Sequence, residues 1–592
     1  MKTPLPYLSG AVAAFFLSVG LVHGGTNIVT SGADDGPGSL RFAVQQSLPG
    51  DFIVFAINGT VFLTSGEILI SKDLSIIGND PANQAISGIN GYRIFSITSG
   101  VSVVIAHLTL RDGRTPNGTN GTNGAPSGPN TNGGTGESSN PGGAIVNLGA
   151  LSLTNCHLIS NRTGNGGKGG AGGGTFTSSG EGGLGGSSGN GGAIYNVGTL
   201  ILSRCVLSSN RTGQTGDGGD SRSIYGVAGL FAGKGGAVYN GGTSIVVQCT
   251  FNANVAGNGG SGGVGAGGGG GGAIYNNGAL SIVDSTLSAN VAGNGGSSLE
   301  NAFGGVGGSG GGLFNGGSCT GTNCTFDGNR SGNGGNRGGF SPSAGTGGDG
   351  GGVFAGSTFV SCNSTFIRNV TGKGGSHVAI PGSEVPPGRG GGIHGSGATL
   401  FNSLIASNSS VPNSSYYALT DVYGTFTSSG NNLVSVTNGS TGFTNGTDLC
   451  GSLANPLAAG IGPLAANGGP TMTCALLAGS PAIDAGGNTP TSTDQRGFPR
   501  QSGLAVDIGA FEVQTPSGPP RMTGLFASNG LFKFAFTNRP GALFAVLSST
   551  NIALPRTNWT LLGQATENSA GQFQFSDTTT NNQHRFYLLR SP

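Results

Sequence analysis

The chain has 592 residues, of which 124 are glycine, 35% are hydrophobic and only 8% are charged. This length exceeds what one ordinary globular core holds, so the chain contains several domains or a repeat array. The glycine fraction is well below one third, whereas collagen requires a glycine at every third position. The formal net charge of +1 excludes a strongly basic face, so nucleic acid is not an expected partner.

The first 24 residues have the pattern of a signal peptide. Lys2 precedes an apolar run from Ala11 to Val22, and Val22 and Gly24 are small residues at the −3 and −1 positions of a cleavage site. We therefore expect export, with a mature chain that starts near Gly25 and is secreted or held at the cell surface. The apolar run is shorter than the ~20 residues of a spanning helix, so no membrane-spanning segment is expected in the mature chain; an uncleaved N-terminal anchor is the alternative.

Residues 25–141 are predicted to form an N-terminal cap and the first coils of a solenoid. A short amphipathic helix is expected over 39–46, with Ser39 as its N-cap and Leu40, Ala43 and Val44 on one side. Apolar runs predict strands at Phe52–Ile57, Glu67–Ile70, Leu74–Ile77 and Val101–Ile105. The first coil of a solenoid exposes core and unpaired strand edges, so it needs such a cap.

Residues 142–415 repeat a short unit seven times. Each unit opens with Gly-Gly and an apolar pair, as in Gly191–Asn196, and closes on another Asn after 16 to 18 residues. The second glycines are Gly143, Gly192, Gly236, Gly272, Gly312, Gly352 and Gly392. Between units lie stretches of Gly, Ser and Asn whose length varies, so the invariant part is short.

Like residues fall into columns when the units are aligned on the closing Asn. Three positions before it stand Leu158, Leu207, Phe251, Leu287, Phe326, Phe366 and Ile405; eight before it stand Leu153, Leu202, Val246, Ile282 and Leu400, with Gly321 and Ser361 as exceptions. Apolar and polar residues alternate within a unit, as in a strand with one buried face. The pattern predicts an all-β fold, a right-handed parallel β-helix whose coils stack at roughly 4.8 Å.

Two columns of asparagine are predicted to form structural ladders. The closing Asn residues are Asn161, Asn210, Asn254, Asn290, Asn329, Asn369 and Asn408, and a second column holds Asn147, Asn196, Asn240, Asn276 and Asn315. Asn tolerates the left-handed conformation of a tight corner, and its amide can bond the same amide one coil away. A ligand-binding stripe is the alternative for the closing column.

The glycine-rich segments, such as 164–192 and 257–272, are predicted to be surface loops extruded from one edge of the solenoid. Two states remain open for them: disorder, or stacking as extended glycine chains.

The C-terminal part is predicted to contain three pieces. Residues 416–515 end the β-helix, 516–520 form a Pro-rich linker, and 521–592 form a small antiparallel β-sandwich. Strand-like runs in the sandwich are Leu531–Phe536, Ala542–Leu547, Gln572–Phe575 and Arg585–Leu589.

Several motifs resemble known families. Asp35–Val44 resembles the N-terminal motif of secreted bacterial β-helix proteins of the CSLREA type, and the Gly-Gly-Ala-Ile units are similar to polymorphic outer-membrane-protein repeats. Residues 461–512 resemble the choice-of-anchor Q domain through Gly462-Pro-Leu-Ala, Asn467–Thr471, Gly479–Gly486, Thr493–Pro499 and Asp507–Glu512. The resemblance implies a surface-associated β-helix with no assigned catalytic residues. Relatives of the repeat carry a many-stranded membrane barrel at the C-terminus, and only about 75 residues follow the linker here, which puts self-translocation in doubt.

No catalytic constellation is evident. Glycoside hydrolysis requires two carboxyl groups within about 10 Å across a cleft. Between Gly142 and Asn408 the carboxylates are Glu181, Asp217, Asp220, Asp284, Glu300, Asp327, Asp349 and Glu384. Asp284 and Asp327 lie in strand-bearing parts of their units, and the others lie in loops that position them poorly.

Other candidates have structural explanations. His394-Gly395 faintly resembles a pectinase fragment but aligns with the apolar Ile145/Ile194 column. Asp217, Asp220 and Asp349 lack the nine-residue repeat of calcium solenoids. The charge set Asp484, Asp494, Arg496, Asp507 and Glu512 is expected to fix turns and form ion pairs.

The cysteines and the single tryptophan are also expected to be structural. Cys156, Cys205, Cys249 and Cys324 share one column with Ser285, Ser364 and Ser403, which indicates a small buried side chain. Export permits disulfides, and Cys450 with Cys474 is the expected pair. Trp559 is expected in the core of the sandwich, with stacking on a sugar as the alternative.

The sequence thus favours a non-catalytic secreted or cell-surface β-helix with an adhesin-like, matrix or scaffold role. It predicts no cofactor, no metal site and no catalytic residue; the expected partner is a cell-surface or matrix polysaccharide or a protein. The alternatives are a carbohydrate-active β-helix enzyme and a purely structural coat component.

Overall fold

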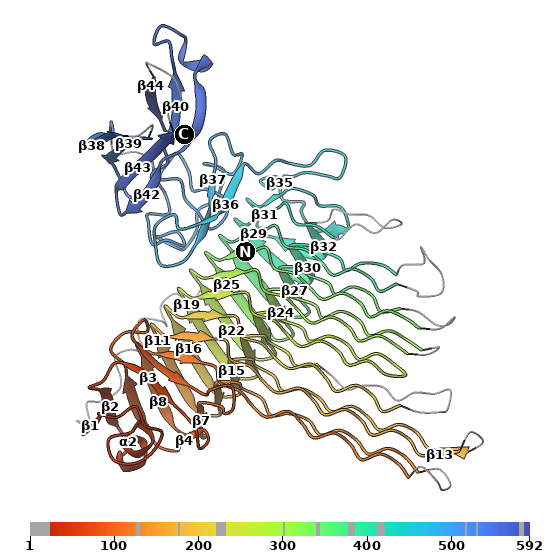
Figure 1. Ribbon diagram of the computed structural model, residues 1–592. Helices are drawn as coiled ribbons and strands as arrows, with labels where there is room; N and C mark the ends of the chain where they lie inside the picture. Colours follow the sequence, from red (N-terminus) through yellow and green to blue (C-terminus); the bar gives the residue numbers. More distant parts are fainter. Residues whose placement is uncertain are drawn as a thin grey trace, which may run out of the picture.

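The computed structural model describes residues 24–125, 131–175, 178–220, 232–299, 302–338, 344–376, 385–410, 421–515, 518–528, 531–578 and 585–591. The chain is a parallel β-helix followed by small antiparallel sheets, as predicted (Figure 1). The predicted signal peptide lies outside the described residues, apart from Gly24. In the described part of the chain no helix is long and apolar enough to cross a membrane.

The N-terminal cap contains the predicted helix. Helix α2 spans Leu40–Gln46, Ser39 caps it by accepting the backbone N–H of Phe42, and Leu40, Ala43 and Val44 are buried. The helix contacts strands β1 (Thr26–Val29), β2 (Asp51–Phe55) and β4 (Ile68–Ile70). It therefore covers apolar side chains of the first coils, as the sequence predicts for a capping element.

Each coil contributes three short strands, and each strand pairs in parallel with its counterpart in the next coil. The first ladder contains β4, β7 (Phe95–Ile97), β10 (Ile145–Asn147), β15 (Ile194–Asn196), β18 (Val238–Asn240), β21 (Ile274–Asn276), β24 (Leu313–Asn315), β27 (Val353–Ala355) and the start of β30 (Ile393–Phe401). The second contains β1, β2, β5 (Leu74–Ile77), β8 (Ser102–Ala106), β11 (Ala150–Thr154), β16 (Thr199–Ser203), β19 (Thr243–Val247), β22 (Ala279–Val283), β25 (Ser318–Thr322), β28 (Phe359–Cys362) and the end of β30. Strand β32 (Val422–Ser428) pairs with β30 along both ladders, and β34 (Ser440–Thr441) pairs with the middle of β32.

The third ladder forms a separate sheet of 12 strands. It contains β3 (Gly59–Phe62), β6 (Gln84–Ser87), β9 (Thr109–Arg111), β12 (His157–Ile159), β17 (Val206–Ser208), β20 (Thr250–Asn252), β23 (Thr286–Ser288), β26 (Thr325–Asp327), β29 (Thr365–Ile367), β31 (Leu404–Ala406), β33 (Leu433–Val434) and β35 (Leu449–Cys450). The strands predicted between 52 and 105 match β2, β4, β5 and β8 closely.

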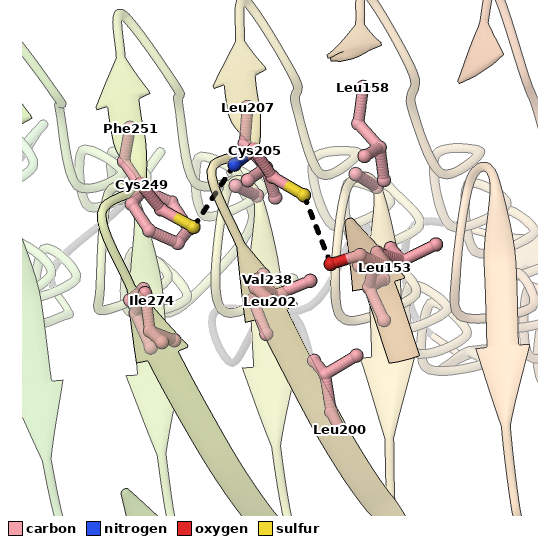
Figure 2. Packing of buried hydrophobic residues seen from close by; sticks show 14 of the residues in the cluster. Leu153, Leu158, Leu200, Leu202, Cys205, Leu207, Val238, Cys249, Phe251 and Ile274 are labelled. Atoms are coloured by element: carbon pink, nitrogen blue, oxygen red, sulfur yellow. Dashed lines mark hydrogen bonds between the residues drawn. The ribbon is translucent and has the colours of Figure 1, made fainter. Parts of the chain in front are cut away.

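The predicted apolar columns form the core. Leu158 pairs with Leu207, and Leu207 pairs with Phe251, so the column three residues before the closing Asn is stacked in register. Leu153 and Leu202 stack in the same way on the second ladder. Figure 2 shows these side chains pointing into the interior of successive coils. All five side chains are fully buried.

The closing asparagines form the predicted ladder, but the left-handed residue is a different one. The side-chain amide of Asn161 donates to the side-chain oxygen of Asn210 at 3.0 Å, and the pattern continues to Asn408. The positive φ belongs to the residue before each Asn, such as Ser160 (φ 57°) and Ser209 (φ 55°). The second asparagine column is also bonded, as between Asn147 and Asn196 at 2.7 Å.

The register corrects the sequence alignment in three units by one residue. Leu313 pairs with Ile274, so Gly312 takes the place of Ala273, and the same offset applies to Gly352 and Gly392. His394 consequently pairs with Phe354 and lies in the column after Ile145/Ile194. The alignment failed because a third glycine precedes the apolar pair in these units.

The glycine-rich segments form extended, ordered arms that stack on one another (Figure 1). The backbone N–H of Gly186 donates to Gly167 within one arm, that of Gly167 donates to Glu137 of the preceding coil, and that of Gly118 donates to Asn165 of the next, each at 2.8 Å. Glycines recur every third residue, as at Gly166, Gly169 and Gly172, which is the period of the polyproline II conformation. The tip of one arm is a short hairpin of β13 (Gly174–Thr175) and β14 (Ser178–Ser179).

Close packing explains why the arms are glycine. A Cβ added to Gly166 would lie 1.9 Å from the carbonyl oxygen of Gly186, and one added to Gly183 would lie 1.9 Å from that of Gly134. No side chain fits at such distances, so glycine is the residue that lets backbones approach this closely. Of the two states left open by the sequence, the described arm residues adopt the stacked one.

Only part of the segment 416–515 adds coils. Strands β32 to β35 extend the ladders, whereas β36 (Ile461–Ala465) and β37 (Thr473–Leu476) form an antiparallel pair. The segment from 461 to 513 lies against the third ladder. Thr286 donates to the carbonyl oxygen of Met472 at 2.6 Å, and Thr325 donates to the side-chain oxygen of Gln495 at 2.6 Å.

The C-terminal domain contains two antiparallel sheets. One holds β38 (Arg521–Ser528), β39 (Leu531–Thr537), β43 (Gln572–Thr578) and β42 (Thr566–Ser569), and the other holds β41 (Thr560–Gln564), β40 (Ala545–Ser549) and β44 (Phe586–Arg590). Four of these strands were predicted from their apolar runs. Trp559 corrects the prediction that it lies in the core: it follows the short 3-10 helix Arg556–Asn558, is partly exposed, and its Nε1 donates to the carbonyl oxygen of Leu554.

Candidate functional site

Three arginines occupy equivalent positions on successive coils. Arg114, Arg162 and Arg211 form a continuous parallel bridge, and the last two directly follow the closing residues Asn161 and Asn210. Their Cα atoms are thus separated by one strand spacing of roughly 4.8 Å. The adjacent buried asparagines alternate with them, so the arginine side chains point outward. The row lies where the glycine arms leave the coils.

The arginine row lines a groove with a volume of about 240 Å³. The lining residues come from four coils and share a position at the root of the arms; they are Arg114, Arg162, Thr163, Asn165, Arg211, Thr212, Gly213, Gln214, Ala256, Gly257 and Asn258. None of them is acidic. We call this feature the arginine groove.

The charges of the groove are not compensated within the described residues. No ion pair to Arg114, Arg162 or Arg211 is formed there. The Nε atom of Arg162 is buried without a hydrogen-bond partner. Burial, together with the like charges of Arg114 and Arg211, lowers the pKa of Arg162 from its usual value. An anion placed among the three guanidinium groups would relieve this repulsion.

The walls of the groove are held rigidly by hydrogen bonds. Thr163 donates to the carbonyl oxygen of Gly189 at 2.9 Å and accepts the backbone N–H of Gly213 at 2.9 Å. The side-chain oxygen of Asn165 accepts the backbone N–H of Gln214 at 3.1 Å, which leaves its NH2 group to donate. The groove therefore presents preorganised donors, a property of sites that bind oxygen-rich ligands.

Sequence reasoning missed this groove, although a signal was present. The motif Arg-Thr-x-Asn/Gln recurs in successive units, at Arg114–Asn117, Arg162–Asn165 and Arg211–Gln214. The arginine directly follows the closing Asn in the units of Asn161 and Asn210, one position beyond the apolar and Asn columns that define the repeat.

An aromatic row runs along the first ladder. The stacked or tilted rings are Tyr195, Tyr239, Tyr275, Phe314, Phe354, His394 and Tyr423, with centroids 4.4 to 5.6 Å apart. Because the ring faces contact one another, they are not available to stack on a sugar. Arg389 covers Tyr423 at 4.8 Å. His394, which faintly resembled part of a pectinase site, is a member of this row, with its Nδ1 3.4 Å from Asp349.

The carboxylates weighed as catalytic candidates have structural partners. Asp284 accepts the side-chain amide of Asn323 at 3.0 Å, and burial raises its pKa to about 6. Asp327 pairs with Arg368 at 2.6 Å. On the arms, Asp217 accepts the backbone N–H of Ser261 and Asp349 that of Arg389. Glu300 and Glu384 lie outside the described residues.

Four members of the charge set, Asp494, Arg496, Asp507 and Glu512, are buried in the segment 461–513, and Asp484 is half-buried. The Oδ2 atom of Asp494 accepts hydrogen bonds from Nε of Arg496 at 2.8 Å and from Nη2 at 2.7 Å, an ion pair that the sequence predicts. Asp507 and Glu512 accept backbone N–H groups from Asp484, Val513 and Ser502. Burial, followed by the charge of Asp507, raises the pKa of Glu512 to about 8. These bonds fix the turns of the segment 461–513, whereas residues such as Gln495 bond it to the coils.

The cysteine column serves hydrogen bonding. The sulfur of Cys249 accepts the backbone N–H of Cys205 at 3.3 Å (Figure 2). The hydroxyl oxygen of Ser285 does the same for the backbone N–H of Cys249 at 3.0 Å. All eight cysteines are free, which corrects the expected disulfide. Cys450 lies on β35, whereas the sulfur of Cys474 accepts a hydrogen bond from Arg368. In the described ranges no three His, Cys, Asp or Glu side chains come together as metal ligands.

Comparison with known proteins adds little. No family model and no curated protein matches the chain. One solved structure, tailspike protein 3 of bacteriophage CBA120, is similar at 13% sequence identity with a TM-score of 0.19; the match covers 67% of this chain and 60% of that one. The chain thus spans less than two thirds of the tailspike. The parallel β-helix is established by the strand pairing and not by this match.

Proposed function

We propose that the chain is a non-catalytic, secreted or cell-surface β-helix protein with an adhesin-like or matrix-scaffold role. The arginine groove carries this proposal, because it is a preorganised and positively charged site whose lining contains no carboxylate. Hydrolysis of a glycoside requires two carboxyl groups at the site. A groove of this composition is suited to holding a ligand.

The bonded ladders support the scaffold role. Buried asparagines, stacked rings and stacked glycine arms repeat along the coils, so every coil is fixed to its neighbours by side-chain and backbone bonds. Stability in such an array is approximately the sum of unit and interface terms. A rigid rod of this kind would present its groove at a distance from the surface that carries it.

The alternative that the test must address is a carbohydrate-active β-helix enzyme, a polysaccharide lyase or a glycoside hydrolase. The purified chain should be incubated with a panel of neutral and acidic polysaccharides. We expect no reducing ends and no unsaturated sugars above the buffer control. Their release above that control would overturn the non-catalytic proposal.

The proposed location requires a separate test. Fractionation of the native host, with detection of the full chain, should place it in the medium or on the cell surface. Recovery of the chain with its residues 1–24 intact in the cytosol would contradict export.

A further inference from the structure

We propose that the arginine groove binds an acidic polysaccharide, whose carboxylate or sulfate groups lie along the row Arg114, Arg162 and Arg211. This inference rests on the proposed binding role and names the class of its ligand.

The first argument is the geometry of the charges. The three arginines repeat at one coil spacing, roughly 4.8 Å, along the axis of the rod. A single small anion reaches one or two of them. A polymer that carries one anionic group per sugar advances by about one strand spacing per residue, so successive anions can meet successive guanidinium groups, each by a charge-assisted and often bidentate hydrogen bond.

The second argument is that no acidic side chain of the described residues pairs with the arginine row. The described residues supply no ion pair to the row, and the buried Nε of Arg162 has no acceptor. By contrast, Arg368 and Arg496 each pair with an aspartate. Three like charges held together without a partner repel one another and destabilise the folded chain. A bound polyanion would remove this repulsion, and the free energy gained would strengthen its binding.

The third argument concerns the remaining lining. Asn165, Gln214 and Asn258 contribute amide groups, which suit the hydroxyl groups of a sugar. No aromatic side chain lines the groove, so it lacks the stacking platform typical of single-stranded nucleic acid sites. The formal net charge of +1 also disfavours nucleic acid. The observations therefore favour a polysaccharide.

The chain offers a matched control. Arg330 follows the closing Asn329 as Arg162 follows Asn161, but its neighbours in the bridge are Val291 and Val370. It is thus an arginine at the same position of the coil without charged neighbours. Arg211 is exposed, so its replacement should leave folding intact.

Binding should be measured by calorimetry on the full chain with polygalacturonate, its methyl ester, dextran sulfate and dextran. We expect the two charged polymers to bind and the two neutral ones not to bind. Arg211→Gln should weaken binding, and Arg162→Gln combined with Arg211→Gln should weaken it at least tenfold, since each replacement removes a charge-assisted hydrogen bond to the polymer. Arg330→Gln should change it less than twofold.

The choice of polymers and variants distinguishes the possible results of this experiment. A preference for polygalacturonate or for dextran sulfate identifies carboxylate or sulfate as the anion. Binding that is unchanged in the double variant, equal loss with Arg330→Gln, or tighter binding to a single-stranded oligonucleotide would overturn the inference. Cleavage of a bound polymer would refute the non-catalytic role and leave the ligand class intact, whereas absence of both cleavage and anion-dependent binding would refute the ligand class alone.

Discussion

The side-chain oxygen of Asn290 accepts two hydrogen bonds from Asn254, one from its backbone N–H at 3.0 Å and one from its side-chain amide at 2.9 Å. Asn290 in turn donates to Asn329 at 2.8 Å and to the carbonyl oxygen of Phe251 at 3.0 Å. One buried side chain thus satisfies groups from the coil before it and the coil after it. The corner of each coil depends on the equivalent asparagine of the ladder.

Replacement of Asn290 by alanine should destabilise the β-helix strongly. The change leaves a buried backbone N–H and a buried carbonyl without partners, at a cost of roughly 1–3 kcal/mol for each group. We expect a loss of about 3–5 kcal/mol, visible as a lower midpoint of denaturant unfolding. Asn294→Ala, on the exposed part of the arm, is the control and should shift the midpoint far less. Equal effects of both changes would contradict the ladder's role.

The stacked arms predict different outcomes for alanine at two nearby glycines. A Cβ at Gly265 would lie 1.9 Å from the carbonyl oxygen of Gly296, whereas one at Gly267 would lie 3.6 Å from its nearest neighbour, a methyl group of Val306. Gly265→Ala should force the backbones apart and break the bond from Gly296 to Ala266. Because one such bond contributes about 1 kcal/mol, amide exchange at Gly296 should accelerate several-fold or more. With Gly267→Ala it should stay at the unmodified rate.

The core and the ladders were predictable because side chains of the same type recur at the same position of each unit. Leu158 and Leu207 occur at the same distance from Asn161 and Asn210, and stacking follows directly. The state of the arms was not predictable from side chains, because Gly166 and Gly183 have none and reveal their contacts only through backbone distances. The arginine groove was missed because a net charge near zero conceals a local row such as Arg162 and Arg211.

The free energy of unfolding should depend on pH through the segment 461–513. Glu512 is buried, and burial raises its pKa from the ordinary value of 4.5 to about 8, so the native state keeps a proton that the unfolded chain releases. Its contribution to stability is complete below pH 4.5 and is lost as the pH rises through 8. The free energy of unfolding should therefore fall by on the order of 2–5 kcal/mol between pH 5 and pH 9.

The measurement is the thermal midpoint as a function of pH. Glu512→Gln should flatten the curve, because the side chain no longer titrates. Glu181→Gln, which changes an exposed carboxylate on an arm, should leave the slope unchanged. A midpoint that rises from pH 5 to pH 9 in the unmodified chain would contradict the direction of the pKa shift.

The cysteine column predicts that hydrogen-bond acceptance matters more than sulfur. Cys249→Ser should be tolerated, with a loss of about 1 kcal/mol or less, because Ser285 already accepts the equivalent backbone N–H in the next coil. Cys249→Val should cost about 1–3 kcal/mol, since the N–H of Cys205 is then buried without an acceptor. Denaturant unfolding under reducing conditions distinguishes the two. A more stable Val than Ser variant would show that burial of apolar volume dominates this position.

The stacking of the aromatic row should stabilise the β-helix. Phe314 stacks on Tyr275 at 4.4 Å and on Phe354 at 4.9 Å, and each contact of this kind contributes about 0.5–1.5 kcal/mol beyond the burial of area. Phe314→Ala should therefore lower the free energy of unfolding by about 2–4 kcal/mol, and Phe314→Tyr should restore most of it, because Tyr195 and Tyr239 stack in the same column. Val146 occupies this column in a coil without a ring, so Val146→Ala measures the effect of side-chain size alone. If Phe314→Ala cost no more than Val146→Ala, the stacking of the rings would add nothing to the stability of the β-helix beyond side-chain size.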